Sequence, residues 1–318
     1  MDTRQMLLDT AEKMFADHCD KSLLDQAERG EFPDGLLGLI RDGGFQQLAM
    51  SSSGVELADA LAVLRVAGLY ALPLPLAEML LANRWLGNDE RLVSIGTGDA
   101  SGADNVPWGR TMEAVIALSP KGEAHLLTDL SVEEGSNLAG EPRDSVRAGA
   151  AEPLRIEEDT DVLLALTRAV MMAGGLERAL ALSLDYVSER EQFGRPISKF
   201  QAIQHHMAVM AAETAASIRA ADAGLAGLGS DRQREEVAAA KARIGEAVGV
   251  VAELAHQVHG AMGYTHEHQL HHTTRRLWAW RDEYGTEQVW QQQLGSALAR
   301  RVAERGGDSL WDFIASHG

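Results

Sequence analysis

The sequence has very little cysteine and an excess of acidic residues. Cys19 is the only cysteine among 318 residues, so no internal disulfide can form, which suits a reducing compartment. The formal net charge of −18 repels nucleic-acid backbones and anionic lipid surfaces. No apolar run is long enough to cross a bilayer, and the amino-terminal sequence lacks the features of a secretion signal. We therefore expect a cytoplasmic protein that binds neither nucleic acid nor membrane.

Sequence signatures of several common enzyme classes are also missing. There is no GxGxxG or GxxxxGKS/T pattern for a nucleotide and no GxSxG pattern for a nucleophilic serine. Histidines are frequent between His205 and His272, but they form no HExxH pattern and no cysteine lies among them. These absences argue against nicotinamide enzymes, P-loop ATPases and serine hydrolases, and we predict no metal site.

The hydrophobic pattern predicts a mainly α protein in three parts: an N-terminal helical domain over residues 1–90, a shortened β-rich middle region over 91–156 and a C-terminal helical bundle over 157–318. The four helices expected in the bundle run from Val162 to Ser188, from about Ser198, from Arg234 to His259 and from Glu287 to Arg305. The second of them should bury one apolar stripe, formed by Phe200, Ile203, Met207, Ala211, Ala215 and Ile218.

Two segments of the carboxyl-terminal half are more specific than these patterns. Residues 188–208 have the sequence SEREQFGRPISKFQAIQHHMA, in which a Phe-Gly-Arg-Pro turn joins two predicted helices. Residues 257–288, QVHGAMGYTHEHQLHHTTRRLWAWRDEYGTEQ, contain a Gly-rich helix end, a basic helix and a loop. In this order and at this separation the two segments resemble the carboxyl-terminal domain of the acyl-CoA dehydrogenase family. Residues 72–86, LPLPLAEMLLANRWL, are similar to helices that precede it in that family.

The resemblance implies an acyl-CoA dehydrogenase-like fold whose FAD lies between subunits, with an acyl-CoA as substrate and an electron-transfer flavoprotein as electron acceptor. The reaction removes an alpha proton and a beta hydride from the acyl thioester. Arg190 of the ERxxFG pattern offers a planar fork suited to a pyrophosphate. Ala261 stands where the family normally has glycine. The full set of residues that the resemblance assigns to FAD is Arg190, Phe193, Phe200, Gln201, Gln257, Gly260, Ala261, Thr286 and Gln288.

The catalytic base is missing from both positions where the resemblance would place a carboxylate. Tyr284 occupies the position of the glutamate in the family's Tyr-Glu-Gly-Thr loop, and a tyrosine with a pKa of about 10 accepts a proton poorly at neutral pH. The second position falls on Leu164. The family's flavin-binding strand motifs are also absent between Leu92 and Ile156.

Three hypotheses follow. The chain keeps the residues that serve a neighbour's flavin, and in this it resembles the smaller subunit of two-gene bacterial acyl-CoA dehydrogenases. Those enzymes form mixed tetramers and act in the degradation of steroid and other bulky acyl chains. A homologous partner chain would then supply the base. Alternatively, the chain is a complete homo-oligomeric enzyme that uses Glu283, or else Asp282, as the base. The third hypothesis is a flavin-free binding or scaffold protein on the same fold.

Overall fold

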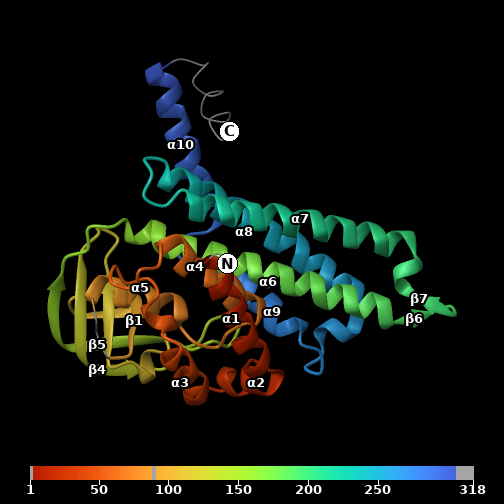
Figure 1. The fold of residues 1–318 in the computed structure, drawn as a ribbon, viewed down its shortest axis with the longest axis horizontal. Helices are drawn as coiled ribbons and strands as arrows, with labels where there is room; N and C mark the ends of the chain where they lie inside the picture. Colours follow the sequence, from red (N-terminus) through yellow and green to blue (C-terminus); the bar gives the residue numbers. More distant parts are fainter. Residues whose placement is uncertain (1–2, 88–90, 306–318) are drawn as a thin grey trace.

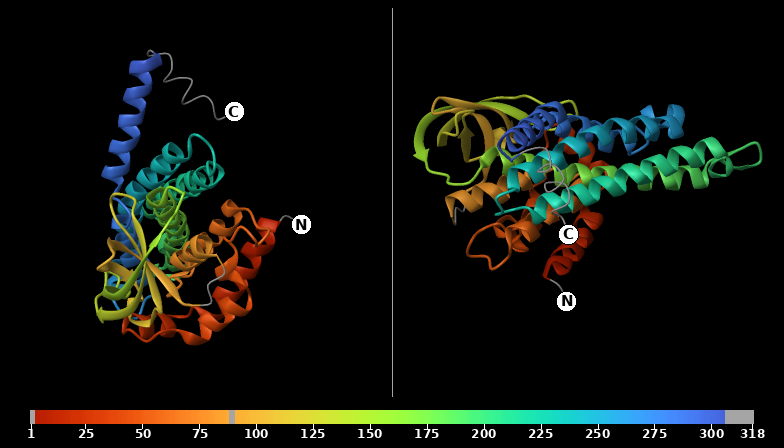
Figure 2. Two further views of the ribbon diagram at one scale, coloured as in Figure 1. Left: turned by 90° about the vertical axis from the view of Figure 1, so that its left-hand side faces the viewer. Right: turned by 90° about the horizontal axis from the view of Figure 1, so that it is seen from above.

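The computed structural model describes residues 3–87 and 91–305, which form ten α-helices and a small group of strands. Helices account for 62% of the structure, which confirms the mainly α prediction. Among the described residues, no helix combines the length and the apolar character that crossing a membrane requires. The barrel formed by the strands and the β6–β7 hairpin lie at opposite ends of the long helices (Figure 1 and Figure 2).

Five helices precede the strands: α1 (Thr3–His18), α2 (Lys21–Glu28), α3 (Asp34–Asp42), α4 (Leu57–Leu69) and α5 (Leu76–Leu86). Helix α2 begins where the Asp20 side chain accepts a hydrogen bond of 2.8 Å from the backbone N–H of Leu23, a typical N-cap. Helix α5 is buried almost all round. Its Glu78 is 1% exposed, and a charge in such surroundings requires a partner.

The middle region is a closed five-stranded barrel made of β1 (Val93–Asp99), β2 (Gly102–Pro107), β3 (Ala114–Leu118), β4 (Ala124–Glu133) and β5 (Arg143–Leu154). The strands follow the order β1-β2-β5-β4-β3, and parallel pairing of β1 with β3 closes the barrel, with Ile95 opposite Ile116. Val106, Val115 and Leu127 fill its interior. The sequence predicted separate strands without closure, because the pattern of one strand carries no information about which distant strand it joins.

The carboxyl-terminal helices are α6 (Thr160–Glu189), α7 (Gln201–Ala226), α8 (Gln233–His259), α9 (Leu270–Asp282) and α10 (Glu287–Arg305), with the short hairpin β6 (Glu191–Gln192) and β7 (Arg195–Pro196) after α6. Helices α6, α7 and α8 pack along one another, and α9 packs against α6 and α8. Helix α10 begins against α8 and then projects away from the body (Figure 1). Therefore α9, rather than α10, completes the packing beside α6.

The predicted stripe of α7 was wrong in part. Met207 is buried, but Ala211 and Ala215 are exposed. The predicted stripe averages 3.6 residues per turn and therefore stays on one side of the helix, but an adjacent side contacts the core. The buried face instead alternates steps of three and four residues, through Met207, Met210, Thr214, Ser217 and Ala221.

Glycines allow α4 and α6 to cross in close contact. A β-carbon on Gly174 would lie 1.9 Å from the carbonyl oxygen of Arg65, and one on Gly68 would lie 1.9 Å from that of Met171. This crossing brings the amino-terminal helices onto α6, and a single apolar core extends from Ala11 to Trp290. The division into domains at residues 90 and 156 stays a prediction.

Candidate functional site

Arg190 and Phe193 lie at the hairpin that follows α6. Phe193 and Gly194 have φ angles of 56° and 79°, as a two-residue type I′ turn requires. Glycine adopts this conformation freely, but for a bulky phenylalanine it is strained. The Phe193 side chain is nevertheless 92% exposed. An exposed aromatic residue on a strained turn indicates contact with a ligand or a partner.

The base of the hairpin is organised by aromatic contacts. The Arg195 guanidinium lies 4.3 Å from the ring centre of Phe200, and the Phe193 ring packs edge-on against Phe200 with 6.3 Å between ring centres. Gln201 begins α7 directly after Phe200 and is exposed. The hairpin projects beyond the end of α6 and α7 (Figure 1).

The end of α8 lies at the same end of the molecule. Gln257, Gly260 and Ala261 are exposed there, and Gly260 ends the helix with a φ of 57°. The ring of Tyr186 stacks on that of His259 with 4.4 Å between centres, which joins the last turns of α6 and α8. The backbone N–H of Arg190 donates to the carbonyl oxygen of Tyr186 at 2.9 Å.

The structure does not bring Thr286 and Gln288 to this end. They lie at the start of α10, beyond the far end of α9. A helix of 13 residues is ~20 Å long. The nine predicted FAD contacts therefore form two groups: seven residues lie at the hairpin end, and two lie at the start of α10.

A network of buried charges lies at the interface of α5, α6, the barrel and the loop after α9. Arg168 Nε lies 2.5 Å from Glu283 Oε2, and its Nη2 donates to Glu78. Arg143 Nε donates to the other Glu283 oxygen at 2.9 Å. The Tyr284 hydroxyl donates to Glu78 Oε1 at 3.1 Å. Each charge is thus neutralised inside the protein, as buried ions require.

The ionisation of Glu283 and Tyr284 follows from these contacts. Burial by itself raises the pKa of Glu283, but Arg143 and Arg168 outweigh this effect and hold the pKa at about 2. Burial and the neighbouring Glu78 raise the pKa of Tyr284 well above its usual value. Near neutral pH neither group is suited to accept a proton from a substrate.

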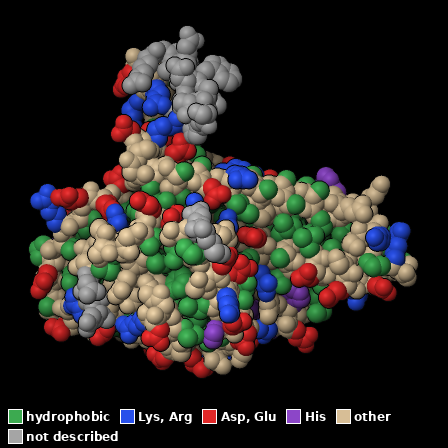
Figure 3. Space-filling view, viewed as in Figure 1, with side chains coloured by type: hydrophobic (Ala, Val, Ile, Leu, Met, Phe, Trp, Pro, Cys, Tyr) green, Lys and Arg blue, Asp and Glu red, His purple; other side chains and the backbone are tan. Residues whose placement is uncertain are grey.

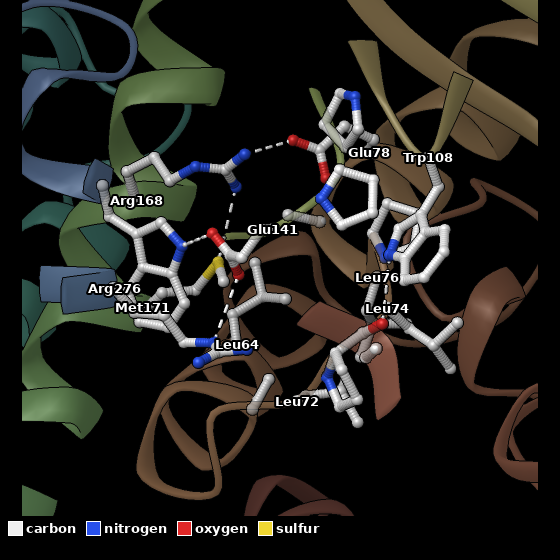
Figure 4. Close-up of a pocket in the computed structure, with 18 of the residues that line it drawn as sticks. Leu64, Leu72, Leu74, Leu76, Glu78, Trp108, Glu141, Arg168, Met171 and Arg276 are labelled. Atoms are coloured by element: carbon white, nitrogen blue, oxygen red, sulfur yellow. Dashed lines mark hydrogen bonds and ion pairs between the residues drawn. The ribbon is translucent and has the colours of Figure 1, made fainter. Parts of the chain in front are cut away.

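Glu283, Tyr284 and Arg143 line a hollow of about 340 Å³ on one side of this network. The space on the α5 side, in contrast, is nearly filled. It is lined mainly by apolar groups of α4, α5 and the segment between them, together with Trp108, Arg168 and Trp280. Trp280 Nε1 donates to Glu141 Oε2 at 3.1 Å, and Arg276 approaches the other oxygen of Glu141 (Figure 4). The remaining cavity of about 20 Å³ has room for roughly one water molecule.

Known proteins with similar sequences and folds place this geometry in context. The family described as "Acyl-CoA dehydrogenase, C-terminal domain" matches residues 164–299. Acyl-CoA dehydrogenase IpdE2 of Mycolicibacterium smegmatis is 30% identical over 228 residues, which cover 69% of this chain and 71% of that protein. The chain belongs to the acyl-CoA dehydrogenase family. IpdE2 of Mycobacterium tuberculosis is 29% identical over 84% of this chain and 88% of its own length.

Solved structures confirm the fold. A chain of the ChsE4-ChsE5 complex from Mycobacterium tuberculosis superposes with a TM-score of 0.84 at 18% identity, over 94% of this chain and 98% of that one. A steroid ACAD named Tcur3481-Tcur3483 gives a TM-score of 0.81 at 22% identity, over 94% and 98% of the two chains. As a family member, this acyl-CoA dehydrogenase is an oxidoreductase that acts on acyl-CoA, and its cofactor is FAD.

The exposed residues fit one half of an FAD molecule. Arg190 offers a cation for a pyrophosphate, and Gln201 and Gln257 offer amides. Gly260 leaves its backbone open to close approach, since no side-chain atom lies within 4 Å of its Cβ position. These FAD contacts stay predictions residue by residue.

Neither family position for the base contains a carboxylate, and the neighbouring Glu283 is not free to act. Leu164 is buried in α6, Tyr284 is a hydrogen-bond donor to Glu78, and Glu283 is held between two arginines. Asp282 is exposed at the end of α9. The dehydrogenase chemistry therefore calls for a proton acceptor other than Glu283.

Sequence analysis missed several members of the charge network, although a signal for them exists. Glu78 and Arg168 each stand alone within a strongly apolar helical run, and Lys241 follows three alanines. A charge on a buried helix face needs a polar or oppositely charged partner, so each such residue predicts that a partner lies beside it in the fold. Lys241 Nζ, for example, donates to the carbonyl oxygens of Arg281 and Gly285 at 2.8 and 2.9 Å, which fixes the loop that contains Glu283.

Proposed function

We propose that this chain is the partner subunit of a heteromeric acyl-CoA dehydrogenase and completes an FAD site whose catalytic base lies on a homologous chain. One contrast carries the proposal. Six of the seven predicted flavin contacts at the hairpin end are exposed, whereas Glu283 and Tyr284, at the family's base position, are held by Arg143, Arg168 and Glu78.

The surface of α7 supports association with another chain. Ala208, Ala211, Ala212 and Ala215 are exposed on one face of this helix, which continues from the hairpin. Apolar side chains gather along the long helices toward the hairpin end, while acidic side chains are scattered over the rest of the viewed face (Figure 3). Small side chains allow a second helix to approach closely, so this face suits a helical partner subunit.

The contribution of this chain to the reaction would be binding and orientation. The chemistry that FAD supplies when bound is acceptance of the hydride. Arg190 would hold the negative charge of the pyrophosphate through charge-assisted hydrogen bonds, and Gln201 and Gln257 would fix the cofactor's position. The alpha proton of the acyl group would be removed by a carboxylate of the partner chain.

We propose a bulky acyl-CoA, such as a steroid-derived thioester, as the substrate. The support is similarity to IpdE2 and to a structure named as a steroid ACAD. An electron-transfer flavoprotein as acceptor and a cytoplasmic location are further parts of this proposal, carried over from the family resemblance and from the single cysteine.

The alternative of a complete homo-oligomeric enzyme with Glu283 as base has less support. Its motivation is the presence of a carboxylate next to the family's base position, in the sequence Asp282-Glu283-Tyr284. Proton transfer to Glu283 would have to overcome two ion pairs and a pKa of about 2.

Isolation of the tagged chain from its native host tests the proposal. We expect a homologous acyl-CoA dehydrogenase chain to co-purify, and the complex to be yellow and to be bleached by an acyl-CoA substrate. Glu283→Gln should leave the rate of bleaching unchanged. A yellow homo-oligomer that is bleached by substrate, and loses this with Glu283→Gln, would establish the alternative. Absence of flavin with and without the partner would instead indicate a scaffold protein.

A further inference from the structure

Asp25, His271 and His272 form a compact group between α2 and α9. One potential ligand atom from each residue lies within 4.8 Å of the other two. The histidines are 8% and 1% exposed, while Asp25 is half-buried at the surface. Glu28 and Arg276 connect this group to Glu141 of the network around Glu283. His268 connects it to the last turns of α6 and α8.

Hydrogen bonds fix which nitrogen of each ring carries the proton. His272 Nδ1 lies 2.7 Å from Glu28 Oε1, and His271 Nδ1 lies 2.7 Å from the carbonyl oxygen of His268. A carboxylate and a carbonyl accept hydrogen bonds, so Nδ1 carries a proton in both rings. A metal ion would therefore bind at Nε2 of each ring, and any proton on that atom would have to leave. Metal-binding histidines typically have an outer partner like the one at Nδ1.

The Nε2 atom of His272 points toward the Asp25 carboxylate. It is buried and makes no hydrogen bond of acceptable geometry, although Asp25 Oδ1 lies only 3.0 Å away. Lys21 donates to the other oxygen, Oδ2, at 2.6 Å and leaves Oδ1 available.

The surrounding charges limit the affinity without preventing binding. Glu28 is already neutralised by Arg276, at 2.8 Å, and by Arg275, at 3.3 Å. These arginines and Lys21 oppose the entry of a cation, whereas Asp25 attracts it. Two imidazole nitrogens and one carboxylate oxygen suit Zn²⁺ and similar transition metals, and they do not suit Mg²⁺, which prefers oxygen ligands.

We infer that Asp25, His271 and His272 bind one divalent transition metal ion of the Zn²⁺ class. Ligand atoms at most 4.8 Å apart must approach by up to about 1.5 Å to match a tetrahedral zinc site. The ion would join α2 to α9 and so stabilise the contact between the amino- and carboxyl-terminal helices. The inference is independent of the proposed FAD role, and it revises the sequence-based prediction that no metal is bound.

Titration of the metal-free full-length chain with ZnCl2 tests this site by calorimetry and by thermal unfolding. We expect one Zn²⁺ per chain and an increase in Tm, with no response to MgCl2. Asp25→Asn and His271→Gln should each weaken Zn²⁺ binding at least tenfold. His205→Gln, at an exposed position on α7, is the matched control and should bind like the wild type.

X-ray absorption spectroscopy at the zinc edge of the Zn²⁺-loaded chain adds a readout that does not depend on variants. We expect two imidazole nitrogens in the coordination shell, reduced to one in His271→Gln. The inference would be overturned by lack of stoichiometric binding to the wild type, or by equal affinity of wild type and both site variants. The latter result would assign binding to exposed histidines and leave His272 as an ion-paired residue.

Discussion

Arg168 holds Glu283 and Glu78 at the same time, with 2.5 Å between its Nε and the nearer oxygen of Glu283. The contact joins α6 to α5 and to the loop after α9. It lies beside Tyr284, whose ring is 5.0 Å from the guanidinium carbon and which occupies the family's base position. In this chain, therefore, the charges at that position stabilise the fold and are not available for proton transfer.

Replacement of Arg168 should destabilise the protein strongly. Arg168→Met leaves Glu78 and half of the Glu283 pair uncompensated, and loss of one partner of a buried ion pair costs about 3–5 kcal/mol. Urea unfolding at pH 7 measures this loss. Arg155→Met removes an equal charge from a side chain that is 88% exposed, and it should change stability little. Equal stability of the two variants would contradict the network's role.

The contribution of Glu283 should depend on pH. Its folded-state pKa of about 2 lies below the reference value of 4.5, so the folded state binds fewer protons at this site. The stabilisation is then present above pH 4.5 and is lost as pH falls toward 2. Urea unfolding should show Glu283→Gln less stable than wild type at pH 7, with a gap that narrows from pH 5 to pH 3. A difference in stability that stays constant between pH 5 and pH 3 would show that ionisation of Glu283 does not stabilise the fold. Glu123→Gln, at an exposed position, serves as the control.

The α4–α6 crossing predicts opposite effects for two Gly→Ala changes. Gly174→Ala places a β-carbon against the Arg65 backbone and should destabilise the protein by at least about 2 kcal/mol. Gly38→Ala, inside α3, meets no atom within 4 Å and should stabilise by up to about 1 kcal/mol. Denaturant midpoints measure both effects. Similar values for the two variants would contradict the close crossing.

Arg190 should affect FAD binding and not folding. Loss of a charge-assisted hydrogen bond to the pyrophosphate predicts that Arg190→Ala weakens FAD binding by the partnered complex about tenfold to a hundredfold. Fluorescence titration of FAD into the apo complex measures this change. Lys121→Ala removes the same charge at an exposed barrel turn and should leave FAD affinity unaltered. The assignment fails if both variants bind FAD equally well.

The sequence predicted the helices well because each follows from local spacing. The predicted helices over 234–259 and 287–305 agree closely with α8 and α10. Local patterns could not reveal that β1 pairs with β3 to close a barrel, nor that α9 packs beside α6 while α10 projects outward. Such features depend on contacts between distant segments.

The candidate site was predictable only where a motif is contiguous. Arg190 and Phe193 belong to one short motif, and the structure places them on one hairpin. The sequence left Glu283 open as a base, because only three-dimensional packing brings Arg143 from the barrel and Arg168 from α6 to its carboxylate. Asp25 likewise joins His271 and His272 only through folding.

The ratio of FAD to polypeptide tests the central claim most directly. It should be measured by absorbance and amino-acid analysis on this chain alone and on its complex with the homologous chain. We predict no stoichiometric FAD on the chain alone and stoichiometric FAD on its complex with the homologous chain. Retention of one FAD per chain by a homo-oligomer of this protein would contradict the proposal.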